Sequence, residues 1–343
     1  MKILLIGLGS IGQRHLRNIK KINPNTEIYA LRKLRRSFIL NNSNQIVGKN
    51  IIKKYDIKEI RTIKEIKKIN LDAVFINTPS SLHLKYFQTF LNQKLHIFIE
   101  KPLTDKSHKA KIFINQINHK YKQKIMIGHQ LRFNECLIKI RSILKKGTLG
   151  KICGANIYHG ENLNNFHIYE KYNNIYASKK KLGGGVILSQ IHEIDYCLYL
   201  FGSPSSLYAS GGQRSDLKID VEDYANIVFN FNNDKDPFSV NIILDYLQNP
   251  KKRELLIVGS KGSLEWDYYK DTININYYDG SNESFIYKLK DRNELFMREL
   301  KYFFKSIEND TDIRSDFTNA YKCLQIVEKI KHSIKSNKVI NLN

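Results

Sequence analysis

Length, composition and charge restrict what this chain can be. It has 343 residues, of which 42% are hydrophobic and 26% are charged, so we expect two globular domains and no intrinsic disorder. No apolar run reaches the length of a membrane span, and the start MKILLIG is too short for a secretory signal. Four scattered cysteines without a CxxC pair favour a reducing compartment, so we expect a cytoplasmic protein with no metal site. The net charge of +23 could attract nucleic acid, but we attribute it to compositional bias because the lysines are spread along the chain, and we expect no nucleic-acid partner.

Apolar runs and amphipathic stretches alternate over residues 1–128. This alternation predicts right-handed βαβ crossovers and a doubly wound parallel sheet of the Rossmann type. The continuous apolar run at Lys2–Ile6 predicts a first strand that is buried on both faces. Further strands are expected at Glu27–Leu31, Asn50–Ile52, Leu71–Asn77, His96–Glu100 and Lys124–Gly128, and helices at Ser10–Ile22, Ser37–Leu40, Lys58–Ile69, Ser81–Asn92 and Lys106–His119.

The pattern changes over residues 129–343, where apolar residues recur with a period of two. This predicts a second α/β domain with a largely antiparallel, open-faced sheet, and we expect its last helices to pack back on the first domain. Strands are expected at Gly154–His159, Tyr224–Phe231, Phe238–Tyr246, Arg253–Val258, Ser263–Trp266 and Thr272–Tyr278, and helices at Glu135–Lys146, Val186–Leu200, Glu294–Ile307 and Ser315–Ser336.

A glycine-rich motif connects the first strand to the first helix. Gly7, Gly9 and Gly12 form a GxGxxG sequence in the strand–turn–helix context that dinucleotide binding requires. Gly7 would permit the tight turn, Gly9 the approach of a pyrophosphate, and Gly12 the close packing of helix on strand. The helix N-terminus at Ser10 and Ile11 would offer backbone N–H groups to the phosphates.

The choice between NAD and NADP depends on the residues after the second strand. NAD-binding proteins carry an acidic residue about 20 positions beyond the motif, which binds the ribose 2′-hydroxyl. Here Arg32 and Lys33 stand at that place, within the basic stretch Leu31–Arg36, and a guanidinium can bind a 2′-phosphate. The sequence therefore favours NADP, with NAD as the alternative.

Four further motifs bear on function. They are NTPSSLH at Asn77–His83, EKP at Glu100–Pro102, GTLGKI at Gly147–Ile152, and GGGVILSQIHEID at Gly183–Asp195. In their order and spacing, over nearly the whole chain, they closely resemble the glucose–fructose oxidoreductase / inositol dehydrogenase / MocA (Gfo/Idh/MocA) family. The stretch Phe166–Tyr172 followed by Tyr176 and Ala177 resembles the branch encoded with surface-polysaccharide genes.

The resemblance implies an oxidoreductase that moves a hydride between nicotinamide and a hydroxyl or keto group of a sugar or nucleotide sugar. His192 stands at the family's acid/base position, and an imidazole that titrates near neutrality suits the removal of a hydroxyl proton. Lys101 stands where the family stabilises developing alkoxide charge. Asp195 lies on the same helical face as His192 and is expected to take part in catalysis by orienting that ring or stabilising its charged form. Ser189 replaces an aspartate that many members carry, which argues against a polyol substrate such as inositol.

The resemblance also assigns the remaining site residues and the assembly. A homodimer or homotetramer is expected. Because Arg132 stands at the end of the last parallel strand, it is expected to bind an acidic substrate group or a phosphate, with an interdomain ion pair as the alternative. Two other functions are the alternatives to a sugar oxidoreductase. One is a reductase of a non-sugar carbonyl or imine, and the other is an inactive dinucleotide-binding sensor. Expected cofactor-binding residues are Gly7, Gly9, Ser10, Ile11, Gly12, Arg32, Lys33, Thr78, Pro79, His83, Glu100 and Lys101, and expected substrate-binding residues are Arg132, His167, Tyr172, Tyr176, Ser189 and His192.

Overall fold

The computed structural model describes residues 1–33, 36–120, 123–232, 236–289 and 291–342. Its chain divides into two compact units. Unit 1 contains the first 130 residues and two later segments of the chain. The domain boundary that the sequence places after residue 128 stays a prediction. Unit 1 comprises Met1–Gln130, His167–Glu170 and Asp291–Tyr321, and unit 2 comprises Leu131–Phe166, Lys171–Lys290 and Lys322–Asn343.

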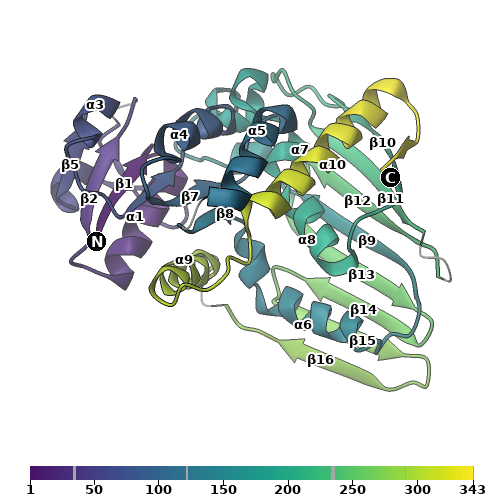
Figure 1. The fold of residues 1–343 in the computed structure, drawn as a ribbon. Helices are drawn as coiled ribbons and strands as arrows, with labels where there is room; N and C mark the ends of the chain where they lie inside the picture. Colours follow the sequence, from purple (N-terminus) through teal and green to yellow (C-terminus); the bar gives the residue numbers. More distant parts are fainter. Residues whose placement is uncertain (34–35, 121–122, 233–235, 290, 343) are drawn as a thin grey trace. The chain divides into compact units, whose positions relative to one another are not determined.

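Unit 1 is built on a six-stranded sheet with the order β5-β2-β1-β6-β7-β8 (Figure 1). Every pairing in this sheet is parallel, which confirms the doubly wound Rossmann arrangement. The strand order reverses between β1 and β6, and ligands bind at such a switch point beyond the carboxyl ends of the strands. The strands are β1 (Lys2–Ile6), β2 (Glu27–Leu31), β5 (Ile57–Ile60), β6 (Ala73–Ile76), β7 (His96–Glu100) and β8 (Ile125–Gly128).

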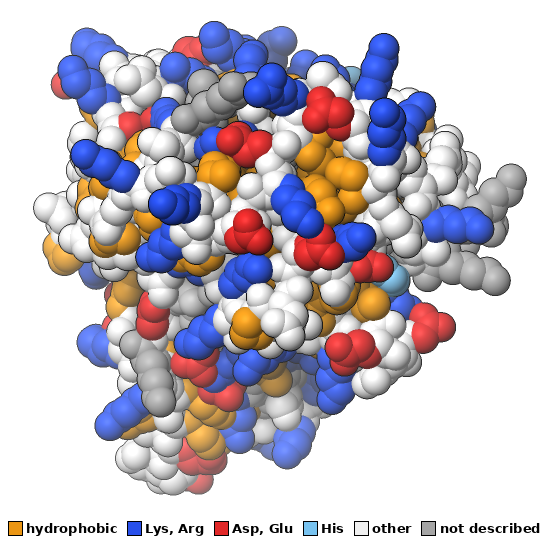
Figure 2. Space-filling view, turned by 90° about the vertical axis from the view of Figure 1, so that its left-hand side faces the viewer, with side chains coloured by type: hydrophobic (Ala, Val, Ile, Leu, Met, Phe, Trp, Pro, Cys, Tyr) orange, Lys and Arg blue, Asp and Glu red, His pale blue; other side chains and the backbone are white. Residues whose placement is uncertain are grey.

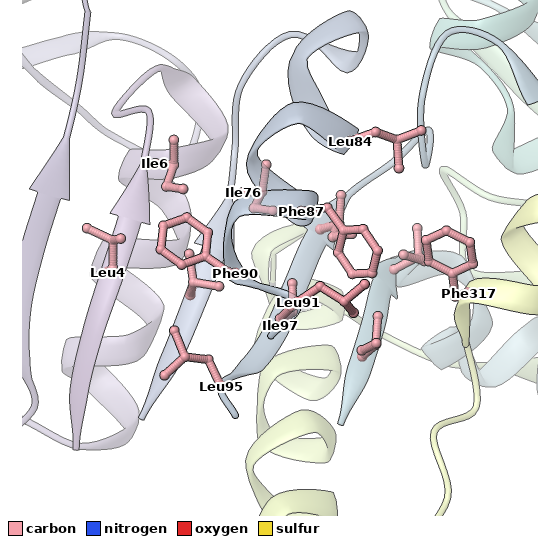
Figure 3. Packing of buried hydrophobic residues seen from close by; sticks show 14 of the residues in the cluster. Leu4, Ile6, Ile76, Leu84, Phe87, Phe90, Leu91, Leu95, Ile97 and Phe317 are labelled. Carbon is pink, nitrogen blue, oxygen red and sulfur yellow. The ribbon is translucent and has the colours of Figure 1, made fainter. Parts of the chain in front are cut away.

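Helices cover both faces of this sheet. On one face α4 (His83–Phe90) and α5 (Ser107–Lys120) pack over alternate strand residues. Figure 3 shows Phe87 and Phe90 of α4 lying against these strand side chains, with Phe317 beside them. On the other face are α1 (Ser10–Ile22) and α9 (Asn293–Glu308). There the rings of Phe75 and Phe98 stack at 5.0 Å and contact His15 of α1 and Phe303 of α9.

Three local predictions in unit 1 were wrong. Residues 37–40, expected as helix, contain β3 (Ile39–Leu40), which pairs with β4 (Ile46–Gly48). Residues 50–52, expected as a strand, begin α2 (Ile51–Lys54), whose first turn the Asn50 side chain caps. The expected helix at 58–69 is instead the edge strand β5 followed by the short α3 (Ile63–Ile66). Pairing of β5 with β2 buries β-branched isoleucines and outweighs the local helical periodicity.

Unit 2 is built on a nine-stranded sheet with the order β16-β15-β14-β13-β9-β12-β11-β10-β17. Its β9–β12 pair is parallel and the others are antiparallel, which confirms the predicted sheet type. Buried and partly exposed residues alternate along β11, so one face covers the core. The strands are β9 (Ile152–Gly160), β10 (Ser206–Gly212), β11 (Tyr224–Phe231), β12 (Phe238–Asp245), β13 (Lys252–Gly259), β14 (Gly262–Asp267), β15 (Thr272–Tyr277), β16 (Asn282–Ile286) and β17 (Ile340–Asn341).

The helices of unit 2 include α6 (Glu135–Lys145) and two short neighbours, α7 (Val186–Ser189) and α8 (His192–Phe201). The last helix, α10 (Phe317–Ser336), belongs to unit 2 from Lys322 onward. A single helix was expected over 186–200, but it is interrupted at Gln190, whose side chain donates a hydrogen bond to the Asp245 carbonyl. This break makes His192 the first residue of α8.

Candidate cofactor and active site

The glycine-rich turn of unit 1 leaves no space for side chains at two positions and open space at a third. Gly7 has φ +92°, and a Cβ there would lie 2.9 Å from the Asn77 carbonyl oxygen. A Cβ on Gly12 would clash with the Gly7 carbonyl oxygen, whereas one on Gly9 would meet nothing within 4 Å. The turn therefore packs tightly against the protein on one side and is open where a pyrophosphate would approach.

The helix that follows this turn fits an anionic ligand. Helix α1 begins at Ser10, has no side-chain cap at Gly9, and carries no acidic residue in its first turn. Its first backbone N–H groups have no partner within the helix, and the helix dipole favours negative charge there. These residues fit the phosphates of a nicotinamide dinucleotide.

Beyond β2, the basic stretch carries carboxylate partners that the sequence analysis missed. The Arg32 guanidinium lies 2.8 and 2.9 Å from Glu59 Oε1 and donates to the Arg36 carbonyl at 2.8 Å. Arg36 in turn lies 2.8 Å from Glu170. Lys33 is exposed, and positions 34 and 35 lie outside the described residues. Glu59 was hidden because it lies in the strand that was predicted as helix.

Two loops at the carboxyl edge of the sheet are fastened by His83. Its Nδ1 lies 2.8 Å from the Pro102 carbonyl oxygen and its Nε2 lies 2.7 Å from the Thr78 carbonyl oxygen. The ring is buried, and this burial lowers its pKa below the ordinary value. Because a neutral imidazole carries one N–H, the ring donates to one of these carbonyls at a time. His83 thus lies between the loop after β6, which contains Thr78 and Pro79, and the loop after β7, which contains Lys101. The peptide bond between Lys101 and Pro102 is cis.

Glu100 connects the first helix to the lysine. Its Oε1 lies 2.6 Å from His15 Nε2 of α1, and its Oε2 accepts a hydrogen bond from the Lys101 backbone N–H at 3.2 Å. Both side chains are buried. Glu299 of α9 is also fully buried, and burial together with the negative charge of Glu100 raises its pKa well above the ordinary value. Glu100 therefore has a positioning role in this structure.

In unit 2, Ser189 is joined to the neighbouring strand and turn by Tyr246. The Tyr246 hydroxyl lies 2.7 Å from Ser189 Oγ and 3.3 Å from the Ala177 carbonyl oxygen. Burial raises the pKa of this phenol far above its ordinary value, so it is protonated. Because a phenol has one proton, it can donate to only one of these oxygens at a time. When it donates to Ala177, Ser189 is the donor to Tyr246.

Asp195 forms a bidentate ion pair with Arg132. Arg132 Nε lies 2.9 Å from Asp195 Oδ2, and its terminal nitrogen lies 2.8 Å from Oδ1. The two side chains are 7% and 2% exposed. Of the two roles predicted for Arg132, the structure supports the ion pair, and it places both partners within unit 2 rather than in different domains.

The residue after His192 anchors helix α8. Glu193 is fully buried and lies 2.8 Å from Arg253 Nε of β13 and 3.2 Å from His159 Nδ1 of β9. Although burial opposes ionisation, the charges of Arg253 and His159 lower the pKa of Glu193 to about 2. This cluster fixes the start of α8, where His192 is also buried. The sequence analysis did not predict this cluster, because its members are far apart in the chain. The one sequence feature that could have indicated it is that Glu193 directly follows His192.

The aromatic residues expected near a substrate fall in different places. His167 belongs to unit 1, where its Nε2 lies 3.2 Å from Ser10 Oγ at the glycine-rich turn. Tyr172 lies in unit 2 and its hydroxyl accepts the Lys218 backbone N–H at 3.2 Å. Tyr176 starts the short turn that contains Ala177, the residue bonded to Tyr246. Tyr176 thus lies in the turn that Tyr246 connects to Ser189. His167 lies instead beside the glycine-rich turn.

The sheet and its glycine-rich turn are those of a dinucleotide-binding protein, and two family profiles define the class. Residues 1–129 match the GFO/IDH/MocA oxidoreductase family, NAD-binding Rossmann fold, and residues 137–265 match the GFO/IDH/MocA C-terminal domain. The chain belongs to the GFO/IDH/MocA oxidoreductase family.

Individual relatives are distant. Oxidoreductase P35 of Formosa agariphila is 26% identical over 220 residues, 64% of this chain, and the chain spans 66% of that protein, slightly under two thirds. Myo-inositol 2-dehydrogenase of Thermotoga maritima is 23% identical over 328 residues, which cover 90% of this chain and 89% of that protein. The solved structure of levoglucosan dehydrogenase with NADH and levoglucosan is similar over 100% of this chain and 99% of that chain, with a TM-score of 0.81 and 16% identity. That likeness shows the fold.

None of the helices formed by the described residues is long and apolar enough to cross a membrane. No group of three or more His, Cys, Asp or Glu side chains among them could hold a metal ion. On the face in Figure 2, lysine and arginine side chains are scattered among acidic and uncharged ones and form no continuous basic stripe.

Proposed function

We propose that the protein is an NAD(P)-dependent oxidoreductase that transfers a hydride between nicotinamide and a hydroxyl or keto group of a sugar or nucleotide sugar. The observation that carries this proposal is the loop after β7, which His83 and Glu100 fasten so that Lys101 follows the carboxyl end of a central strand. Ligands of open α/β sheets bind at that edge. Membership of the family, and relatives named for myo-inositol and levoglucosan, support the substrate class.

A bound nicotinamide would supply the hydride chemistry. The Lys101 ammonium would donate a hydrogen bond to the reacting oxygen and stabilise the charge that develops on it. His192 would remove the hydroxyl proton during oxidation and donate it during reduction, because an imidazole can both accept and donate a proton. Asp195, held by Arg132, would balance the charge of His192 when it is protonated.

The substrate contacts proposed are Ser189, Tyr172 and Tyr176, with His192. Ser189 can hydrogen-bond a sugar hydroxyl but cannot supply a carboxylate charge, which favours a sugar other than inositol. Arg132 is left out of this set because its Nε and one terminal nitrogen bind the Asp195 carboxylate. We further propose a place in surface-polysaccharide or glycan biosynthesis, in the cytoplasm, as a homodimer or homotetramer. These last assignments rest on the family resemblance.

For the cofactor we propose either nicotinamide dinucleotide, with NADP weakly preferred. The described cations Arg32, Lys33 and Arg36 outnumber the paired carboxylates Glu59 and Glu170, which leaves a net positive charge where a 2′-phosphate would lie. Equal affinity for NAD and NADP in a binding titration would remove this preference.

A substrate panel tests the function. Purified protein is assayed for NAD(P)H formation or consumption with inositol, levoglucosan, aldoses and nucleotide sugars, beside simple ketones and imines. We expect turnover with a sugar or nucleotide sugar, and its loss in His192→Asn. Turnover confined to the ketones or imines would contradict the substrate class. Cofactor binding without turnover on any compound would contradict catalysis and favour a sensor, an alternative that the serine at position 189 suggests.

A further inference from the structure

Two carboxylates lie against the described arginines at the end of β2. Glu59 of the edge strand β5 lies 2.8 Å from Arg32, and Glu170 lies 2.8 Å from Arg36. The Arg32 side chain is 7% exposed and the Glu59 side chain 39% exposed. For Arg36 and Glu170 the exposed fractions are 40% and 16%. Each of the two arginines that the structure describes in this stretch is therefore already paired with a carboxylate.

Glu170 reaches this place on the segment His167–Glu170, which is flanked in the chain by residues of unit 2 but belongs to unit 1. His167 Nε2 lies 3.2 Å from Ser10 Oγ, and His167 Nδ1 lies 3.3 Å from Glu170 Oε1. The Tyr169 ring stacks on His167 and contacts Phe38 at 5.5 Å between centroids. The segment thus lies beside the glycine-rich turn and directs Glu170 to the stretch that follows β2.

The charge of Glu170 is fixed at all physiological pH values. Its hydrogen bond to His167 and the adjacent Arg36 guanidinium lower its pKa to about 2. Arg36 is likewise held in its charged form, because the hydrogen bond to Glu170 raises its pKa. This ion pair therefore persists as a pair of full charges.

The end of β2 is where a Rossmann domain recognises the adenosine ribose. NAD presents a neutral 2′-hydroxyl there, which can donate a hydrogen bond to a carboxylate. NADP presents a phosphate with a charge of about −1.5 to −2. A carboxylate beside that phosphate repels it, and an arginine already paired with a carboxylate attracts it less than a free arginine would.

We propose that Glu59 and Glu170 are specificity-determining residues that act against the 2′-phosphate and so lower the affinity for NADP relative to NAD. They take the place of the acidic residue that is missing at the end of β2. The preference between NAD and NADP then depends on Glu59 and Glu170 together with the basic stretch, rather than on the basic stretch alone. This inference rests on the dinucleotide binding in the proposed function and on no assumption about the sugar.

The test compares cofactor affinities in charge-neutral variants of the full chain. Glu59→Gln and Glu170→Gln are titrated with NADH and NADPH, and the dissociation constants are obtained from cofactor fluorescence. Glu27→Gln is the matched control, because Glu27 pairs with Lys58 at 2.6 Å on the same two strands but at the start of β2. It removes the same charge from the opposite edge of the sheet.

We expect the affinity for NADPH relative to NADH to rise at least about tenfold in Glu59→Gln or Glu170→Gln, which corresponds to about 1.4 kcal/mol, and to stay unchanged in Glu27→Gln. A ratio within twofold of the wild-type value in both test variants, or an equal rise in the control, would overturn the inference. Thermal unfolding of each variant verifies that the fold is kept.

The titration needs no sugar substrate. A protein that binds cofactor with the expected ratios but turns over no sugar would contradict the proposed function and leave this inference supported. A wild-type protein that binds neither NADH nor NADPH would overturn both.

Discussion

The ion pair of Arg132 with Asp195 gives a prediction that separates a structural role from substrate binding. The side chains are 7% and 2% exposed and their two contacts measure 2.8 and 2.9 Å. Replacing Arg132 with Met removes the guanidinium that faces the buried Asp195 carboxylate, and breaking a buried ion pair in this way costs about 3–5 kcal/mol. We therefore expect Arg132→Met to lower the free energy of unfolding of unit 2 by that amount, or its Tm by about 6–20 °C.

The chain supplies its own probe for this measurement. Trp266 is the single tryptophan, is buried in β14 of unit 2, and contacts the ring of Tyr196 of α8 at 5.8 Å. Its fluorescence during urea unfolding therefore reports on the unit that contains the ion pair. Lys151→Met is the control, because the Lys151 pair with Asp236 is 68% and 40% exposed and a solvent-exposed pair contributes little to stability.

The double variant Arg132→Met/Asp195→Leu completes the test. It removes both charges, so it should lose less stability than the sum of the two single variants. Unchanged stability in Arg132→Met, together with a raised KM for the sugar identified by the panel, would refute this reasoning and return Arg132 to the substrate-binding residues.

Three further predictions concern the dinucleotide turn, the lysine and a buried carboxyl. Gly9→Ala should keep the stability of the fold, since its methyl group enters open space, but it should weaken cofactor binding about tenfold or more. Gly12→Ala should lower the free energy of unfolding by about 1–3 kcal/mol, because its methyl group clashes with Gly7. Equal effects of both variants on stability would contradict this difference. Lys101→Met should lower kcat by about 10²–10³-fold, and a near wild-type kcat would remove its assignment. Burial and the charge of Glu100 raise the pKa of Glu299, so Glu299 holds a proton in the folded state that the unfolded chain releases above about pH 4.3. Stability should therefore fall as the pH rises from there, by up to about 1.4 kcal/mol per pH unit, until the folded-state pKa is passed. Glu299→Gln should flatten this dependence between pH 5 and 8 in thermal unfolding, and parallel curves for variant and wild type would disprove it.

The elements predicted best from the sequence are those whose signals are local. The strand Lys2–Ile6 and the helix Ser10–Ile22 have the predicted bounds, because a continuous apolar run, a glycine-rich turn and a helical period follow one another directly. The strand Tyr224–Phe231 also has its predicted bounds, since its alternation matches one covered face. The edge strand Ile57–Ile60 was missed because its stability comes from pairing with β2, a contact with a distant segment.

The candidate site shows the same limit. Motifs located the glycine turn, Lys101 and His192 in the chain, but not the contacts that hold them. Glu100 binds His15, which is 85 residues away, and Arg132 binds Asp195, which is 63 residues away. No local pattern encodes such pairings. The neutralisation of Arg32 by Glu59 was hidden for the same reason, so the sequence indicated the positive charges without their partners.

The central proposal is that Lys101 and His192 act together on the oxygen of a sugar beside the nicotinamide. A crystal structure of the ternary complex with NAD(P) and the sugar identified by the panel tests it most directly. We predict that Lys101 Nζ and a ring nitrogen of His192 both lie within about 3.2 Å of the reacting oxygen, with the nicotinamide C4 about 3–3.5 Å from the carbon that exchanges the hydride. An occupied nicotinamide site with either side chain directed away from that oxygen would contradict the claim.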